Sequence, residues 1–145
     1  ESVQLSVFCD MVVLLLQPAV VEATALRDIT TNVLVTQLGM GFCFEERQKK
    51  LLIDDRYYKA DLVFYHRVLK RHVIIELKAH RLDYSDVAQL NMYLAYFRKN
   101  IMLSDDNEPI GILLCSEVGQ EMAEYTMIGA DTNLFSKDGI ASKST

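Results

Sequence analysis

Apolar residues recur at helical intervals in several stretches of the chain. The apolar side chains of residues 85–98 fall three and four positions apart: Val87, Leu90, Leu94 and Phe97. This spacing predicts one apolar face of a helix. Residues 20–38 show a looser pattern of the same kind that ends at Gly39, a residue type that often terminates helices. A further short helix is expected over residues 117–128.

The segments between these helices have the short apolar runs and the aromatic and β-branched enrichment of strands. Four strands are expected: residues 42–53, 57–67, 72–80 and 110–115. The last strand is apolar throughout and follows a helix, which is typical of a buried parallel strand reached by a crossover. The order αβββαβ predicts an α/β fold in which helices flank a mixed central sheet.

The length of 145 residues fits a single domain, which we expect to span residues 1–135. Residues 136–145 lack apolar periodicity and are expected to form a flexible tail. The longest apolar block, residues 11–16, is too short to cross a bilayer, and no basic segment precedes it as in a signal peptide. These features predict a cytoplasmic protein that does not associate with a membrane.

The three cysteines of the chain show no metal-binding spacing. Cys43 and Cys115 both lie in apolar runs. In a reducing compartment such residues behave as small apolar side chains. We therefore expect both to be core residues.

Two acidic residues stand inside the apolar second and third strands. Asp61 lies in the sequence ADLVF and Glu76 in VIIELK. A hairpin centred between residues 68 and 69 places these two side chains opposite each other, roughly 5 Å apart. An unpartnered buried carboxylate is costly, and two that face each other need a shared proton or a bound cation. The pattern therefore predicts a cation site or a proton shared between two acids.

Lys78 follows Glu76 by two positions, so its side chain leaves the same face of the strand. Carboxylate oxygens suit Mg²⁺, which takes one or two carboxylates and completes its shell with water and substrate phosphate. A lysine beside such a site can hold the attacking water or neutralise charge in the transition state. The residues alone leave a simpler alternative open, in which Lys78 bridges two acids of an exposed ion-pair ladder.

Asp61, the sequence Glu76-Leu77-Lys78 and the following QLNMY resemble the core of the PD-(D/E)XK nuclease superfamily. More closely, residues 39–134 resemble the YhcG-like group of bacterial nucleases through GFCFEERQKKLLI, YYKADLVFYHRVLKRHVIIELK, QLNMYLAYF and EPIGILLC. The resemblance implies a restriction-endonuclease-like core, with Asp61 and Glu76 as metal ligands and Lys78 as the catalytic lysine. It implies the backbone carbonyl of Leu77 as a further ligand. The proline of the family's Pro-Asp pair is replaced by Ala60, which removes no ligand.

Gln89 and Tyr93 lie four positions apart, so they share one helix face. The resemblance implies that this face borders the metal and that Gln89 orients water or a metal-bound ligand. An amphipathic helix whose polar side meets solvent is the alternative. Many family members also have a glutamate on the first core helix. Glu22 is the candidate for it, with Asp28 as the other acid of that helix, unless Glu22 is only a solvated charge at a helix start.

Three further residues are weaker candidates for the site. His80 continues the strand face that carries Lys78 and is placed to touch a phosphate, unless it is simply exposed at the strand end. Arg47 and Gln48, in the first predicted strand, reach the site from a neighbouring strand or occupy ordinary surface positions. The sequence does not decide between these alternatives.

The chain has a formal net charge of −5, which by itself argues against a polyanionic partner. The charge is unevenly distributed, because residues 47–81 hold ten bases and four acids, whereas residues 82–145 hold four bases and ten acids. The basic middle segment supplies candidates for contacts with nucleic-acid phosphates: Lys49, Lys59, Arg67, Lys70 and Arg71. A charged sheet edge that discourages aggregation is the alternative for any one lysine.

Chemistry and resemblance together predict a Mg²⁺-dependent endonuclease domain that hydrolyses DNA phosphodiester bonds through a metal-activated water, with Mn²⁺ as a substitute. One alternative is a catalytically silent module that keeps the fold for nucleic-acid binding or assembly, and another is a hydrolase of a different phosphate ester. Members of the group usually carry an N-terminal DNA-binding domain, which we expect to be missing from this chain. A homodimer is also an open alternative.

Overall fold

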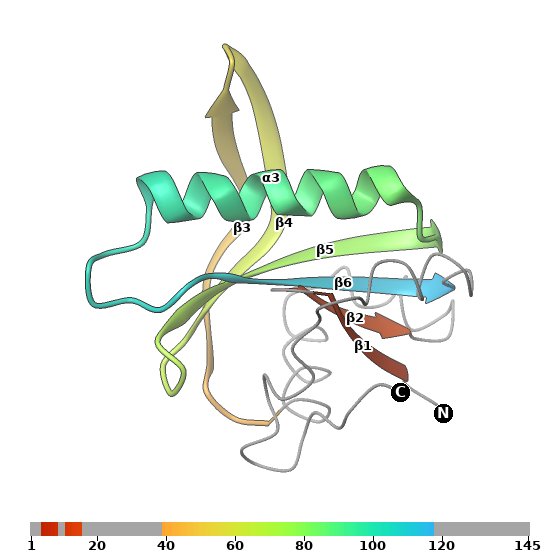
Figure 1. Ribbon diagram of the computed structural model, residues 1–145, viewed down its shortest axis with the longest axis horizontal. Coiled ribbons are helices and arrows are strands. Elements are labelled where there is room, and N and C mark those ends of the chain that lie inside the picture. The colour runs from red at the N-terminus through yellow and green to blue at the C-terminus, as the bar shows by residue number, and fades with distance from the viewer. Residues whose placement is uncertain (1–3, 9–10, 16–38, 118–145) are drawn as a thin grey trace.

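The computed structural model describes residues 4–8, 11–15 and 39–117, which form a six-stranded sheet with a long helix across one face (Figure 1). The order of the strands across the sheet is β1-β2-β6-β5-β4-β3. The elements are β1 (Gln4–Phe8), β2 (Met11–Leu15), β3 (Phe42–Ile53), β4 (Arg56–His66), β5 (Arg71–Arg81), α3 (Tyr84–Asn100) and β6 (Ile110–Glu117).

The strands β3, β4 and β5 form an antiparallel meander, after which the chain crosses over through α3 and places β6 parallel to β5. The sheet is therefore mixed, and the apolar β6 is buried between β2 and β5. This arrangement confirms the predicted α/β class and the parallel position of the fourth predicted strand. The four predicted strands and the helix predicted at residues 85–98 are all present, with ends that differ by no more than two residues.

The sequence pattern does not predict β1 and β2, because it indicates only an apolar block at residues 11–16. β2 pairs in parallel with β6, and β1 pairs antiparallel with β2. A five-residue apolar run becomes a strand only when a sheet offers it a partner, and that partner is about a hundred residues away. The helix predicted at residues 20–38 and the tail lie outside the described residues, as does the helix predicted at 117–128 except for Glu117, which ends β6.

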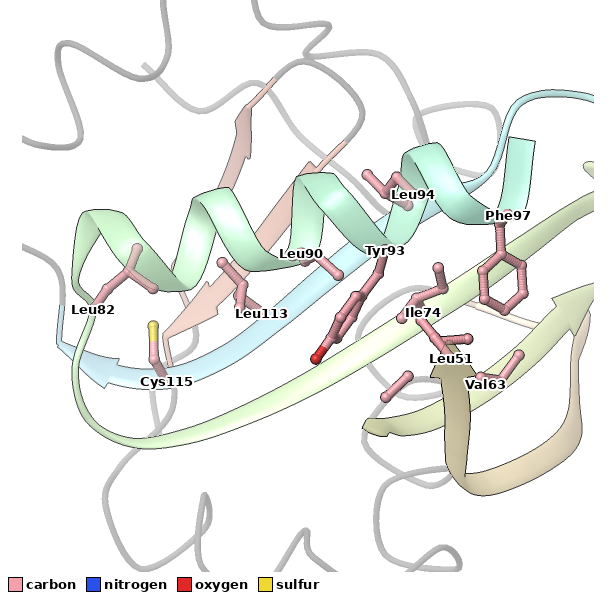
Figure 2. Packing of buried hydrophobic residues seen from close by; sticks show 11 residues of the cluster. Leu51, Val63, Ile74, Leu82, Leu90, Tyr93, Leu94, Phe97, Leu113 and Cys115 are labelled. Atoms are coloured by element: carbon pink, nitrogen blue, oxygen red, sulfur yellow. The ribbon is translucent and has the colours of Figure 1, made fainter. Parts of the chain in front are cut away.

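The helix α3 packs on the sheet through the apolar face that its spacing predicts. Leu90, Leu94 and Phe97 are fully buried in the core cluster, and Figure 2 shows Leu90 and Phe97 extending from the helix towards the sheet. Gly111 in β6 permits this close approach, because a Cβ atom there would lie 2.7 Å from Cδ2 of Leu90. The packing fixes α3 over β5 and β6, and so fixes the residues of its first turns relative to those strands.

The outer halves of β3 and β4 form a two-stranded arm, which we define as residues 49–60. β4 pairs with β5 only from Leu62 to His66, so the arm has no third strand and projects beyond the sheet (Figure 1). Asp54 and Asp55 close it with positive φ angles of 52° and 62°, as in the turns that suit hairpins. The buried side chain of Leu51 anchors the base of the arm in the core under α3.

Of the two cysteines expected in the core, Cys115 is buried but Cys43 is exposed. Cys43 lies on the edge strand β3, and the expectation for it is wrong because an apolar run does not show which face of a strand is covered. No helix among the described residues is long and apolar enough to cross a membrane.

Candidate active site

The β4–β5 hairpin has the register that the sequence predicts. Leu62 lies opposite Ile75 and Val63 opposite Ile74. One step further along this register brings Asp61 opposite Glu76, where the regular pairing of the two strands stops. The two acids therefore sit where β4 and β5 separate.

Side chains replace the backbone hydrogen bonds at this point. The N–H of Asp61 donates to Oε2 of Glu76 at 2.8 Å, and the N–H of Leu77 donates to Oδ2 of Asp61 at 2.9 Å. Each carboxylate thus accepts a hydrogen bond from the backbone of the opposite strand. This reciprocal arrangement fixes both carboxylates in orientation and satisfies two backbone donors that the parting of the strands would leave free.

Glu76 is nearly inaccessible, with 3% of its surface exposed. Burial, followed by the negative charge of Asp61, raises the pKa of Glu76 from 4.5 to about 8, although the hydrogen bond from Asp61 N–H and the charge of Lys78 act in the opposite direction. When both carboxylates are ionised, the site therefore carries more negative charge than the neighbouring residues compensate. A proton or a bound cation relieves that excess.

Lys78 leaves β5 on the same side as Glu76 and reaches the start of α3. Its Nζ lies 3.7 Å from Oδ1 of Asp86, and both side chains are largely buried. Oδ2 of Asp86 accepts the N–H of Asp83 at 2.9 Å, in a capping box that begins the helix. Asp86 therefore ties the lysine to the helix start, a role that sequence reasoning missed. The Asp-x-x-Asp capping pattern was the available signal.

Gln48 reaches the site from β3, which settles one alternative that the sequence left open. Its Nε2 donates to Oδ1 of Asp61 at 3.2 Å. Arg47, the neighbouring candidate, is exposed, and no hydrogen bond or ion pair among the described residues joins it to either carboxylate. Three strands therefore contribute to the environment of Asp61.

Tyr93 projects from α3 towards the sheet (Figure 2) and is buried. Burial, followed by the charges of Glu76 and Asp61, raises the pKa of Tyr93 to about 12. Burial and the two carboxylates therefore keep the phenol of Tyr93 neutral. Gln89 is half-buried one turn earlier on the same helix, but no hydrogen bond among the described residues joins it to the two acids. Its role stays a prediction.

The remaining candidates are not brought to the carboxylates. His80 is exposed, and its Nδ1 lies 2.7 Å from the carbonyl oxygen of Arg81. Glu22 lies outside the described residues. Within the described ranges, no group of three or more His, Cys, Asp or Glu residues is placed to hold a metal.

The donor chemistry nevertheless fits a hard divalent cation. Two carboxylates, one of them buried with a raised pKa, supply oxygen ligands and uncompensated negative charge. Mg²⁺ needs no larger protein cage, because it keeps several waters and takes oxygens from its substrate. Asp61 and Glu76 are therefore the described residues that fit such an ion best.

Comparison with known proteins agrees with this arrangement. The chain is 40% identical over 102 residues to the Escherichia coli (strain K12) protein named "Putative nuclease YhcG", a match that covers 70% of this chain and 27% of that protein. The chain thus spans about a quarter of the length of this relative. A solved repair endonuclease from Pyrococcus abyssi matches with a TM-score of 0.51 at 18% identity, over 69% of this chain and 41% of that one.

The structural match concerns the fold alone and confirms the predicted restriction-endonuclease-like core. A family model described as the YhcG PDDEXK nuclease domain matches residues 14–138, which is most of the chain. It includes every described element except β1 and the first residues of β2. The chain therefore belongs to the YhcG PDDEXK nuclease domain family.

Proposed function

We propose that this domain is a Mg²⁺-dependent endonuclease that hydrolyses DNA phosphodiester bonds. The observation that carries the proposal is the reciprocal pair of hydrogen bonds that orients Asp61 and Glu76 where β4 and β5 part, with Lys78 on the same side of β5. Two oriented carboxylates beside a lysine have the composition of a hydrolytic metal site. Membership of a nuclease family supports the same conclusion.

Each residue has a defined task in this proposal. Asp61 and Glu76 hold the cation, together with the backbone carbonyl of Leu77. When bound, Mg²⁺ supplies an activated water and neutralises charge on the phosphate. Lys78 positions the attacking water or stabilises charge in the transition state, and Gln89 orients water at the edge of the site.

The arm supports contact with nucleic acid. Lys50 and Lys59 are directly opposed across the two strands, and neither has an ion-pair partner among the described residues. Next to them Leu52 and Tyr57 are also opposed, with 49% and 69% of their surfaces exposed. Opposed like charges are unfavourable in an isolated sheet. Nζ of Lys50 lies 5.8 Å from the centroid of the Tyr57 ring, so the ring and the lysine belong to the same exposed face. A polyanion laid along this face would compensate both lysines.

The other basic candidates differ in whether their side chains already contact other residues of the protein. Lys49 pairs with Glu46 at 3.3 Å, and Arg71 donates to the carbonyl oxygen of Glu108 at 3.1 Å. Arg67 and Lys70 are exposed at the turn between β4 and β5. Of the five basic residues that the sequence predicts as phosphate contacts, Lys59, Arg67 and Lys70 are therefore the better supported.

A cleavage assay tests the catalytic proposal. Supercoiled and linear DNA are incubated with the wild-type chain, Asp61→Ala and Lys78→Ala in Mg²⁺, Mn²⁺ or EDTA. We expect metal-dependent cutting by the wild type only. Undiminished metal-dependent cutting by either variant would contradict the assignment. DNA binding without cutting, and without uptake of Mn²⁺ in calorimetry, would favour the silent module.

A binding assay tests the arm separately. Replacing Lys50 and Lys59 by serine removes two phosphate contacts, so the slope of log affinity against log salt should become shallower by about 2. Lys99→Ser, in the last turn of α3 and outside the arm, is the control and should leave the slope nearly unchanged. An unaltered slope in the double variant would exclude the arm as the DNA-binding face. The part of the YhcG relative that this chain does not match would then be the better candidate for that contact.

A further inference from the structure

Gln48 combines an unusual backbone with a contact to the proposed metal ligand. We infer that Gln48 is a positioning residue that holds the Asp61 carboxylate in its metal-binding orientation, and that the strand β3 is distorted in order to place it there. The inference rests on the proposed metal site at Asp61 and Glu76, and it adds a residue that the family resemblance does not assign.

The backbone of Gln48 is in the left-handed region, with φ at 53°. Among the described residues, the other non-glycine residues with positive φ lie in turns: Asp54, Asp55 and Lys70. Gln48 alone of this group lies inside a strand. Glutamine lacks the short polar side chain that makes this conformation tolerable for Asn and Asp, so the conformation is unfavourable without a compensating contact.

The distortion falls opposite Asp61. Arg47 pairs with Leu62 and Lys49 pairs with Ala60, but Gln48 and Asp61, which lie between these pairs, are not paired. Because the ladder is interrupted here on the β3 side and ends here on the β5 side, Asp61 stands at a local opening between its two neighbouring strands. An opening of this kind leaves room for a carboxylate to be held by side chains.

The contact completes the support of Asp61. Oδ1 accepts from Nε2 of Gln48 at 3.2 Å, while Oδ2 accepts from the N–H of Leu77 at 2.9 Å. Each oxygen of the carboxylate is therefore held by a donor from a different strand. Donors that orient a ligating group reduce the disorder that metal binding must remove, and losing such a donor typically weakens metal affinity. Without Gln48, the carboxylate is free to rotate about its single remaining hydrogen bond.

Two substitutions separate this role from a purely structural one. Gln48→Met keeps the length of the side chain and the strained backbone but removes the donor. Gln48→Gly also removes the donor but relieves the backbone, because glycine adopts positive φ freely. If Gln48 only shapes the strand, Gln48→Gly is stabilised and both variants bind metal normally. If it positions Asp61, both variants lose metal affinity, although only Gln48→Gly gains thermal stability.

The experiment measures Mn²⁺ binding by calorimetry and the melting temperature in EDTA for the 145-residue chain. We expect about tenfold weaker Mn²⁺ binding in both variants, a higher melting temperature for Gln48→Gly than for Gln48→Met, and a matching rise in the Mn²⁺ concentration that gives half-maximal DNA cleavage. Asp54→Gly is the control. It relieves a φ of 52° at the tip of the arm and should leave Mn²⁺ affinity unchanged.

The outcomes are distinguishable from a failure of the proposed function. Mn²⁺ affinities within twofold of the wild type in both variants would overturn the role of Gln48 while leaving the metal site intact. An absence of Mn²⁺ binding by the wild-type chain itself would overturn the metal site, and the role of Gln48 with it.

Discussion

Replacing Glu76 by glutamine should stabilise the metal-free protein while destroying its metal site. Burial and the charge of Asp61 raise the pKa of Glu76 from 4.5 to about 8. Between these two values the folded state keeps a proton that the unfolded chain has released, so the free energy of unfolding falls as pH rises through this window. The lost stability is not regained at higher pH. Glutamine has nearly the same shape but does not ionise, so it escapes this loss.

The size of the effect follows from the shift, since one pKa unit corresponds to about 1.4 kcal/mol. The loss is below about 1 kcal/mol near pH 5 and about 4 kcal/mol near pH 8. Urea unfolding of the wild type and Glu76→Gln in EDTA should therefore show that the advantage of the variant grows by about 3 kcal/mol between these pH values. Comparing the two proteins at each pH cancels the titration of groups that they share.

A difference between the two proteins that does not change with pH would refute the reasoning, as would a variant that is less stable than the wild type at pH 8. Asp105→Asn, which removes an exposed carboxylate outside the site, is the control for the loss of one charge. Added Mn²⁺ should raise the melting temperature of the wild type, by an amount that increases with its concentration above Kd, and should leave that of Glu76→Gln unchanged.

Three further changes test the support of the site and the packing beneath it. Asp86→Asn keeps the acceptor of the capping box but removes the negative charge beside Lys78. The rate of DNA cleavage should therefore fall several-fold, which is a smaller loss than in Lys78→Ala. A rate equal to that of the wild type would exclude Asp86 from the site. Gly111→Ala places a Cβ atom 2.7 Å from Leu90 and should cost about 1–3 kcal/mol of unfolding free energy in urea titration. Phe97→Ala leaves a cavity at a fully buried position under α3 and should lower the free energy of unfolding by about 3–5 kcal/mol in the same measurement. A smaller loss would indicate that neighbouring side chains fill the cavity.

Much of the candidate site was accessible from local sequence patterns. The turn between β4 and β5 fixes the register of that hairpin, and the register brings Asp61 to Glu76. The two-residue period of a strand then places Lys78 on the same side as Glu76. Asp86 and Gln48 were harder to find, because their contacts depend on where α3 docks and on how β3 bends. A capping residue and a strand glutamine both have ordinary explanations when only the sequence is known.

The sequence by itself determined the strands β3 to β6, the helix α3 and the identity of the two acids, because side-chain periodicity and turn residues act over a few positions. Only the tertiary structure decided that β1 and β2 extend the sheet beside β6, that Cys43 is exposed and that Gln48 donates to Asp61. These outcomes depend on which distant segment supplies a partner or a cover. That choice is set by the packing of the whole sheet, and no short stretch of residues contains it.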